Sequence, residues 1–298
     1  MTAADGVIVL DKPSGITSFQ AVERVGRVFR KKKCGHAGTL DPIATGVLPV
    51  CVGRATKIAG YLAMQEKEYE VFFRFGVETD TGDSAGRQTG ASPGGIATEG
   101  AVRAAIAALV GEWEQVPPAY SAIKVGGKRA YALARQGKNV ELAGRKVRVY
   151  EAKVLSWSEE GFRVFLHCTK GFYVRALSRD LGRALGVPMT VSELRRLRSG
   201  PFRIKDSILL TDLVASGKRG DAESVLVPIE RAMEGFSRRE IPPEAAAAVR
   251  QGRSPAPWLE GKGERHDTGV ILLTSGQEGP VALVERLASG TWRILRGI

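Results

Sequence analysis

Residues 33–45 read KCGHAGTLDPIAT and place one carboxylate, Asp41, at the end of a loop broken by glycines. Pro42 disfavours helical backbone geometry for the residue before it, so Asp41 is expected in an extended or turn conformation. An ionised carboxylate in such a position can act as a nucleophile through a covalent intermediate. An aspartate before a proline is, taken alone, more often an ordinary turn residue. The neighbouring sequence must therefore decide between the two interpretations.

The charge of the chain favours a polyanionic partner. The 298 residues carry a formal net charge of +12, and the pI is about 9.8. Such an excess is typical of proteins that bind nucleic acid, although a basic solvated surface explains it equally well. Basic residues crowd one face and the end of a predicted helix just before the loop, at Arg24, Arg27 and 30–33. Cations there also suit the helix dipole.

The cysteines and the apolar runs indicate a cytoplasmic protein. Cys34, Cys51 and Cys168 show no paired spacing, which favours a reducing compartment over a disulfide framework. No zinc-binding, phosphate-loop or dinucleotide-binding motif occurs in the sequence. No stretch has the length of a membrane span or the pattern of a signal peptide. We expect no metal and no cofactor.

Apolar spacing predicts strands and helices that interleave irregularly, as in an α+β domain. An apolar run at 6–10 ends in a turn at 11–15, and a helix capped by Thr17 or Ser18 follows. Residues 68–77 alternate like a half-buried strand. The other elements expected before the tail are helices at 98–110 and 173–185, a short helix ending at Gly137, and paired strands at 146–157 and 162–168.

A domain boundary is expected near Phe236, giving a large domain at 1–236 and a small one at 237–298. The small domain holds nine Lys/Arg and seven Asp/Glu, a net charge of +2, so most of the positive charge lies in the large domain. The tail predicts a helix at 244–250 and short strands at 270–273, 281–286 and 292–295. About 60 residues is near the lower limit for a stable domain.

A second cluster bears on the role of Asp41. Arg175 falls in the first turn of the helix expected at 173–185, where a cation is poorly placed for the helix dipole. Asp41 would supply the anionic partner that this position favours. Tyr69 begins a strand and can stack on an unpaired base or exchange a proton in a dry pocket. His36 can contact a base or a phosphate or act in proton transfer. Each residue, taken alone, is more often structural.

The sequence resembles the TruB-type family of bacterial tRNA pseudouridine-55 synthases, which isomerise one uridine in the T-loop of tRNA. The resemblance covers essentially the whole chain. Ala37 stands where many members carry threonine. Seven motifs in order carry the resemblance: LDKPSGITS at 10–18, GHAGTLDP at 35–42, KEY at 67–69, TDTGD at 79–83, PPAYSAIK at 117–124, KGFYVR at 170–175 and LRRL at 194–197.

The resemblance implies a fold and a set of residue roles. It implies a mixed, mainly antiparallel sheet with flanking helices, and a small β-rich C-terminal domain like the RNA-binding PUA module. Asp41 would be the nucleophile and Arg175 the partner that holds it ionised. Tyr69 would pack on the target base and help to move its proton. The remaining substrate contacts would come from His36, Tyr173, Leu194, Lys12 and the basic helix.

Two functions of different kinds fit these expectations. The first is isomerisation of uridine 55 by a monomeric enzyme that binds the T-arm, flips the base and needs no protein partner. The second is a tRNA-binding or tRNA-folding factor whose catalysis is secondary. A third possibility, a zinc-dependent base deaminase, lacks its signature in this sequence.

Overall fold

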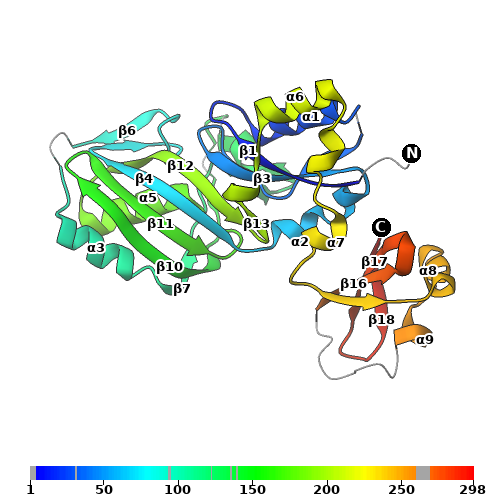
Figure 1. Ribbon diagram of the computed structural model, residues 1–298. Helices are drawn as coiled ribbons and strands as arrows, with labels where there is room; N and C mark the ends of the chain where they lie inside the picture. Colours follow the sequence, from blue (N-terminus) through cyan, green and yellow to red (C-terminus); the bar gives the residue numbers. More distant parts are fainter. Residues whose placement is uncertain are drawn as a thin grey trace.

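The computed structural model describes residues 5–30, 32–92, 95–121, 123–134, 136–138, 140–259 and 269–298. A large mixed sheet with helices packed on it forms the body, and a smaller sheet forms the C-terminal part (Figure 1). The α+β class and the separate β-rich tail expected from the sequence are confirmed. No helix within the described segments is long and apolar enough to cross a membrane.

The large sheet has ten strands in the described part of the chain. Its order is β14-β1-β3-β12-β4-β11-β10-β7, with β13 paired to β12 and β2 paired to β3. Only β1–β14 and β3–β12 are parallel pairs among these, so the sheet is mixed and mainly antiparallel. The strands are β1 (Gly6–Lys12), β2 (Cys34–His36), β3 (Thr45–Val52), β4 (Lys67–Phe75), β7 (Gly111–Gln115), β10 (Arg145–Ser158), β11 (Gly161–Cys168), β12 (Met189–Ser199), β13 (Phe202–Arg203) and β14 (Ile208–Leu209).

Alternation along β4 sets which face of the sheet is buried. Tyr69, Val71, Phe73 and Phe75 face the core, while the residues between them are partly exposed. The period of two makes one face apolar and the other polar, as the sequence predicts. β12 lies beside β4 in the middle of the sheet, although the sequence analysis predicted no strand there.

Helices cover the apolar face of the large sheet in two groups (Figure 1). α1 (Ser18–Val28) and α6 (Leu210–Arg219) pack together beside β1 and β3, and α3 (Glu99–Ala107) and α5 (Val174–Leu185) pack on β10 and β12. Thr17 caps α1 through a capping box with Gln20. The short helices are α2 (Ala59–Ala63), α4 (Ala130–Ala134) and α7 (Ile229–Ala232), with 3₁₀ turns at Gly53–Lys57, Ile204–Asp206 and Ala222–Val225.

The two groups of strands join where β3 meets β12. Their parallel pairing puts Thr45 opposite Arg195 and Gly46 opposite Arg196. Gly46 has a φ of +98°, and a Cβ there would lie 2.2 Å from the carbonyl oxygen of Arg196. Only glycine fits this close approach of two backbones. The junction places the loop before β3, which carries Asp41, next to the centre of the sheet.

The C-terminal sheet has the order β15-β16-β17-β18 and begins at Ser237. Leu272, Leu283 and Ile298 from the tail share one apolar cluster with Val7 and Met233 of the body. The elements of the tail are β15 (Ser237–Glu240), α8 (Pro243–Arg250), α9 (Ala256–Leu259), β16 (Val270–Ser275), a 3₁₀ turn (Gly276–Glu278), β17 (Gly279–Arg286) and β18 (Trp292–Gly297). Two-stranded ribbons elsewhere pair β5 (Val77–Thr79) with β6 (Gln88–Ala91) and β8 (Lys124–Val125) with β9 (Lys128–Arg129).

Candidate active site

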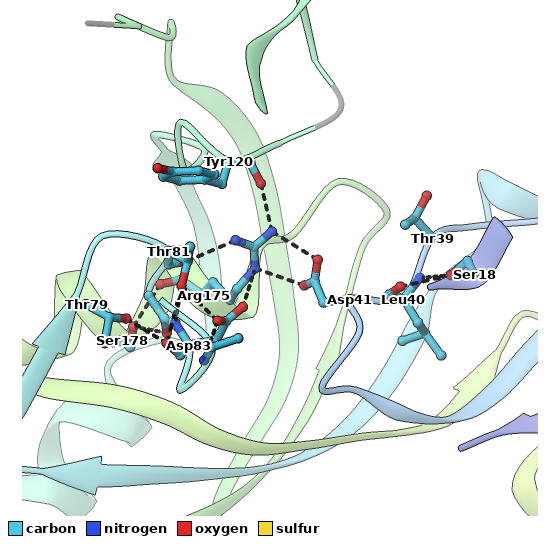
Figure 2. A network of polar contacts seen from close by, with 12 residues as sticks. Ser18, Thr39, Leu40, Asp41, Thr79, Thr81, Asp83, Tyr120, Arg175 and Ser178 are labelled. Carbon is cyan, nitrogen blue, oxygen red and sulfur yellow. Dashed lines mark hydrogen bonds and ion pairs between the residues drawn. The ribbon is translucent and has the colours of Figure 1, made fainter. Parts of the chain in front are cut away.

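The side chains of Asp41 and Arg175 meet in a two-point contact (Figure 2). Arg175 Nε donates to Asp41 Oδ2 at 2.9 Å, and Nη2 donates to Oδ1 at 3.1 Å. The Arg175 side chain is only 8% exposed, whereas the Asp41 side chain is 31% exposed. Charge-assisted bidentate bonds fix the plane of the carboxylate. The pair therefore presents an oriented carboxylate that solvent, and hence a substrate, can reach.

Backbone carbonyls hold the guanidinium from its other side. Arg175 Nη1 donates to the carbonyl of Thr81, and Nη2 donates to the carbonyl of Tyr120, both at 2.9 Å. The buried carboxylate of Asp83 lies 3.6 Å from Nε. These contacts come from two separate segments and, together with Asp41, leave Arg175 little freedom to turn. Sequence reasoning gave no role to Asp83 or to the two carbonyls, although two quoted motifs contain these residues.

Gly82 allows the Thr81–Asp83 turn to approach Arg175. Its φ is +75°, and a Cβ at this position would lie 2.6 Å from the carbonyl oxygen of Arg175. Ser178 closes the same contact by donating both to that carbonyl and to the carbonyl of Gly82. The glycine in the motif TDTGD is therefore needed for close packing against the first turn of α5.

The loop that carries Asp41 is attached to the start of α1 and to the turn after β1. Ser18 Oγ donates to the carbonyl of Leu40 at 2.9 Å and accepts from its N–H at 2.8 Å (Figure 2). The N–H of Gly15 donates to the carbonyl of Pro42 at 2.8 Å. Asp41 lies between these two anchored residues. The motif LDKPSGITS thus serves to hold the motif GHAGTLDP in place.

Lys12 lies in the interior, whereas a residue that binds RNA phosphates is expected at the surface. The residue is 0% exposed. Its ammonium donates to the carbonyls of Pro13 and Ile16 at 2.8 Å and to that of Pro42 at 3.4 Å. Burial lowers its pKa to about 8, against the opposing effect of Asp41. A buried ammonium bonded to three carbonyls does not reach a phosphate, so the expectation that Lys12 holds the RNA is corrected: Lys12 positions the loop.

Arg196 is a second buried arginine, and the sequence analysis gave it no role. It is 1% exposed and donates to the carbonyls of Val47 at 2.7 Å, Gly38 at 3.1 Å and Thr39 at 3.3 Å. Two of these carbonyls belong to the loop that carries Asp41. Burial lowers the pKa of the guanidinium, while the nearby Tyr69 and Asp41 oppose that shift. Arg196 therefore ties the loop to the central strand β12.

Tyr69 lies opposite Arg196 in the pairing of β4 with β12. It is 9% exposed. Burial raises the pKa of its phenol to about 12, although the positive charge of Arg196 acts in the other direction. The hydroxyl is therefore protonated at neutral pH and is available as a hydrogen-bond donor. Leu194, 6% exposed, lies on the same strand and faces the same core.

Tyr173 and His36 differ in the charged groups that act on them. Tyr173 precedes α5, and the charges of Arg175 and Asp41 both affect its pKa, which burial raises. His36 is half-buried on β2, and burial and Arg196 lower its pKa. Its Nδ1 is buried and makes no hydrogen bond within the described residues. The structure thus brings Tyr69 and Tyr173 within electrostatic reach of Asp41, which Arg175 binds, while Leu194 lies opposite Val71 in the pairing of β12 with β4.

Two family models match this chain. The TruB family pseudouridylate synthase (N terminal domain) matches residues 26–174, which include Asp41 and Tyr69. The tRNA pseudouridylate synthase B C-terminal domain matches residues 175–234, which include Arg175 and Arg196. Together the matches span residues 26–234, which is most of the body, and end just before the small C-terminal sheet.

Curated relatives are similar over most of their length. The tRNA pseudouridine synthase B of Chromohalobacter salexigens is 42% identical over 85% of this chain and 82% of its own. The enzyme of that name from Geobacillus kaustophilus is 42% identical over 83% of this chain and 90% of its own. That of Novosphingobium aromaticivorans is 41% identical over 98% of this chain and 97% of its own.

Solved structures share the fold of the whole chain, including the C-terminal sheet. A chain of the archaeal box H/ACA sRNP Nop10–Cbf5 complex has a TM-score of 0.75 and 25% identity, covering 99% of this chain and 86% of that chain. A chain of a Cbf5–Nop10–Gar1 complex has the same TM-score and 27% identity, with coverage of 99% and 84%. From the two family models and these relatives we conclude that this chain belongs to the TruB family of pseudouridylate synthases.

Proposed function

We propose that this protein converts a uridine of tRNA to pseudouridine and that its target is uridine 55 in the T-loop. The observation that carries the proposal is the bidentate contact of Asp41 with Arg175, which leaves the carboxylate partly exposed. Membership of the TruB family supports the reaction, and the relatives named tRNA pseudouridine synthase B support tRNA as the substrate.

The reaction needs only groups that this chain supplies. The N1–C1′ bond breaks, the uracil turns, and a C5–C1′ bond forms. The proton on C5 leaves and N1 ends protonated, so nothing is oxidised and no group is transferred away. Asp41 can enter by adding to C6 of the base, by attacking C1′ or by assisting loss of the 2′ proton. Each route starts from an ionised carboxylate held in a fixed orientation, which Arg175 provides.

The target base must leave its stack before it can meet Asp41. Flipping a base costs a few kcal/mol, which contacts to the flipped base and to the phosphates offset. We assign the packing against the base to Tyr69 and the lining of the uridine pocket to Leu194 and Tyr173. The protonated hydroxyl of Tyr69 is suited to proton transfer at the base. His36 on β2 is assigned to the region of the T-loop around the flipped nucleotide.

The alternative function, an RNA-folding factor with secondary catalysis, is not favoured. The curated relatives carry the name of a synthase, and the Asp41–Arg175 geometry has no evident use in RNA folding. We propose that the protein acts as a monomer in the cytoplasm. Light scattering at micromolar concentration checks the first point, and cell fractionation checks the second.

Incubation with unmodified tRNA and mapping of pseudouridine at single-nucleotide resolution tests the proposal. One modified site, at position 55, is expected. A transcript with cytidine at position 55 is the matched control and should gain no pseudouridine. Modification at another position would refute the assignment of the T-loop, and the absence of pseudouridine from every position would refute the activity.

A further inference from the structure

A groove beside the exposed start of β10 contains basic side chains that the proposed site does not use. Its volume is about 480 Å³. Lys146 and Arg148 come from β10, Lys170 follows β11, and Met64, Gln65 and Glu66 come from the segment between α2 and β4. The remaining lining residues are Glu112, Val147, Tyr150 and Thr169.

The start of β10 directs its basic residues into this groove. Lys146, Arg148 and Tyr150 are exposed, whereas Val147 and Val149 between them are buried in the core. Because side chains alternate along a strand, the three exposed residues share one face at a spacing of about 6.7 Å. Lys170 adds a third cation from the turn after β11, and its amine contacts the sulfur of Met64 at 3.4 Å.

Arg148 is held at the groove by an aromatic ring. Its guanidinium carbon lies 5.5 Å from the centre of the Tyr150 ring, in cation–π contact. The ring of His167 lies 4.7 Å from the same ring. Tyr150 therefore contacts both Arg148 and His167 at the groove. The Tyr150 ring orients Arg148, whose side chain remains 55% exposed.

The acidic residues of the groove leave its lysines uncompensated. Glu66 lines the groove but faces neither lysine: it bonds to His167 Nε2 at 2.8 Å and lies 3.7 Å from Arg198, which also pairs with Glu68. Glu112 lies 3.7 Å from Arg148, and this exposed pair is weak. Lys146 and Lys170 make no ion pair with any residue in the described ranges. The groove thus carries excess positive charge in a form that suits an anion.

The groove is continuous with the framework of the proposed active site. Thr169 Oγ1 accepts from the N–H of Arg148, and the N–H of Thr169 donates to the carbonyl of Arg148, both at 2.9 Å. The chain then passes through Gly171 to Tyr173, whose backbone is bonded twice to the side chain of Gln115. Arg145, one residue before Lys146, acts on the pKa of Tyr173. One connected segment of chain therefore links the groove to the backbone around Tyr173.

We propose that this groove is a phosphate-binding subsite for the RNA backbone, in which Lys146, Arg148 and Lys170 contact phosphates of the tRNA outside the catalytic site. The inference rests on the proposed function, because it takes tRNA as the ligand. Lysines act here as point charges, and Arg148 supplies directed N–H donors. Such contacts position the RNA and carry no sequence information.

The test compares two double variants that remove the same charge. The first double variant, Lys146→Ala with Lys170→Ala, removes the two lysines of the groove. Lys153→Ala with Lys205→Ala removes two exposed lysines outside the groove. Binding of unmodified tRNA is measured by filter retention across a salt series, with unfolding by urea as the check that both proteins are folded. Lys153 lies on the same strand, which makes it a close match.

We expect the groove variant to bind tRNA about tenfold more weakly at about 100 mM salt, with a salt slope reduced by about 1.5, since each phosphate contact contributes about 0.7–0.9. Its kcat at saturating tRNA should stay within about twofold of the wild type, and the control should match the wild type. Equal affinities of the two double variants would overturn the subsite. Wild-type protein that forms no pseudouridine would instead overturn the proposed function, so the two failures are distinguishable.

A second pair of variants isolates the orienting effect of Tyr150. Tyr150→Leu removes the ring under Arg148 and should weaken tRNA binding by about threefold, in proportion to a modest cation–π contact. Tyr150→Phe keeps the ring and should bind like the wild type. Weakening of the same size in both variants would show that the ring does not orient Arg148 and would contradict this part of the proposal.

Discussion

Asp41 and Arg175 stand 134 residues apart in the sequence and meet through two hydrogen bonds of 2.9 and 3.1 Å. The arginine sits in the first turn of α5, where the helix dipole disfavours a cation. Two carbonyls and a second aspartate, Asp83, offset that cost. Arg175, fixed by these groups, therefore holds one side of the Asp41 carboxylate, and the exposed side of the carboxylate is left for the substrate.

Arg175→Lys should lower kcat by about 100-fold or more, because a lysine cannot make the two parallel bonds that fix the carboxylate plane. The affinity for tRNA should change by less than about threefold, since the net charge is kept. Single-turnover kinetics with unmodified tRNA measures the rate of the chemical step separately from binding.

The matched control is Arg179→Lys, one turn further along α5. Arg179 bonds to Asp180 and to the carbonyl of Val116 and does not touch Asp41. Its substitution should leave the single-turnover rate within about threefold of the wild type. A similar loss of rate in both variants would mean that α5 as a whole, and not the contact with Asp41, limits catalysis.

Tyr69→Phe should reduce the rate of the chemical step by about 100-fold or more while tRNA affinity is kept, because the ring remains and only the proton donor is lost. The pKa of Tyr69 is raised to about 12 by burial, so the wild-type hydroxyl is protonated throughout the neutral range. Rate and affinity are measured on the same preparation. A full wild-type rate in Tyr69→Phe would limit Tyr69 to packing.

Gly46→Ala should destabilise the protein by about 3 kcal/mol, because the new Cβ would lie 2.2 Å from the carbonyl oxygen of Arg196 and φ is +98°. Gly35→Ala is the matched control from the neighbouring β2, since a Cβ there meets nothing within 4 Å. The free energy of unfolding in urea measures both. A difference of less than about 1 kcal/mol between them would contradict the close packing of β3 on β12.

The lowered pKa of Lys67 predicts that the free energy of unfolding changes with pH. It is 6% exposed, and burial together with the charge of Arg196 lowers its pKa from 10.5 to about 8. Between these values the unfolded chain keeps a proton that the folded protein has released, so stability rises with pH in this range. The free energy of unfolding of the wild type minus that of Lys67→Met should therefore increase by up to about 1.4 kcal/mol per pH unit above pH 8.

Urea unfolding at several values between pH 7.5 and about 9 checks the expectation for Lys67, and the upper limit stays below the pKa of about 10 that tyrosine has in the unfolded chain. Lys12, whose pKa is also lowered to about 8, is present in both proteins and cancels in the difference. A difference that stays constant across this range would contradict the lowered pKa of Lys67.

The sequence was sufficient for the features that follow from local pattern. The alternation at 68–77 predicts β4 and its buried Tyr69, and the capping candidates Thr17 and Ser18 predict the start of α1, which Thr17 caps. The poor fit of a cation at the start of α5 points to a partner for Arg175, and the structure supplies Asp41. In each case the physical signal lies within a few residues of the position concerned.

Features that depend on contacts with backbone groups far away in the sequence were not predictable from local sequence pattern. Residues 194–198 contain three arginines, so their pattern gives no sign of a central strand. Arg196 is buried there because carbonyls of Gly38, Thr39 and Val47 satisfy it. The sequence also does not reveal that Lys12 turns inward, since its partners are backbone oxygens and carry no residue-specific signal.

The most direct test of the central claim measures tritium released from C5-labelled uridine in unmodified tRNA by the wild type, by Asp41→Asn and by the exposed Asp212→Asn. The account predicts release by the wild type and by Asp212→Asn. In Asp41→Asn, release should fall by about 10⁴-fold or more at nearly unchanged tRNA affinity, because an amide is not a nucleophile of this kind. Release at a similar rate by Asp41→Asn would contradict the assignment of Asp41 as the reacting group.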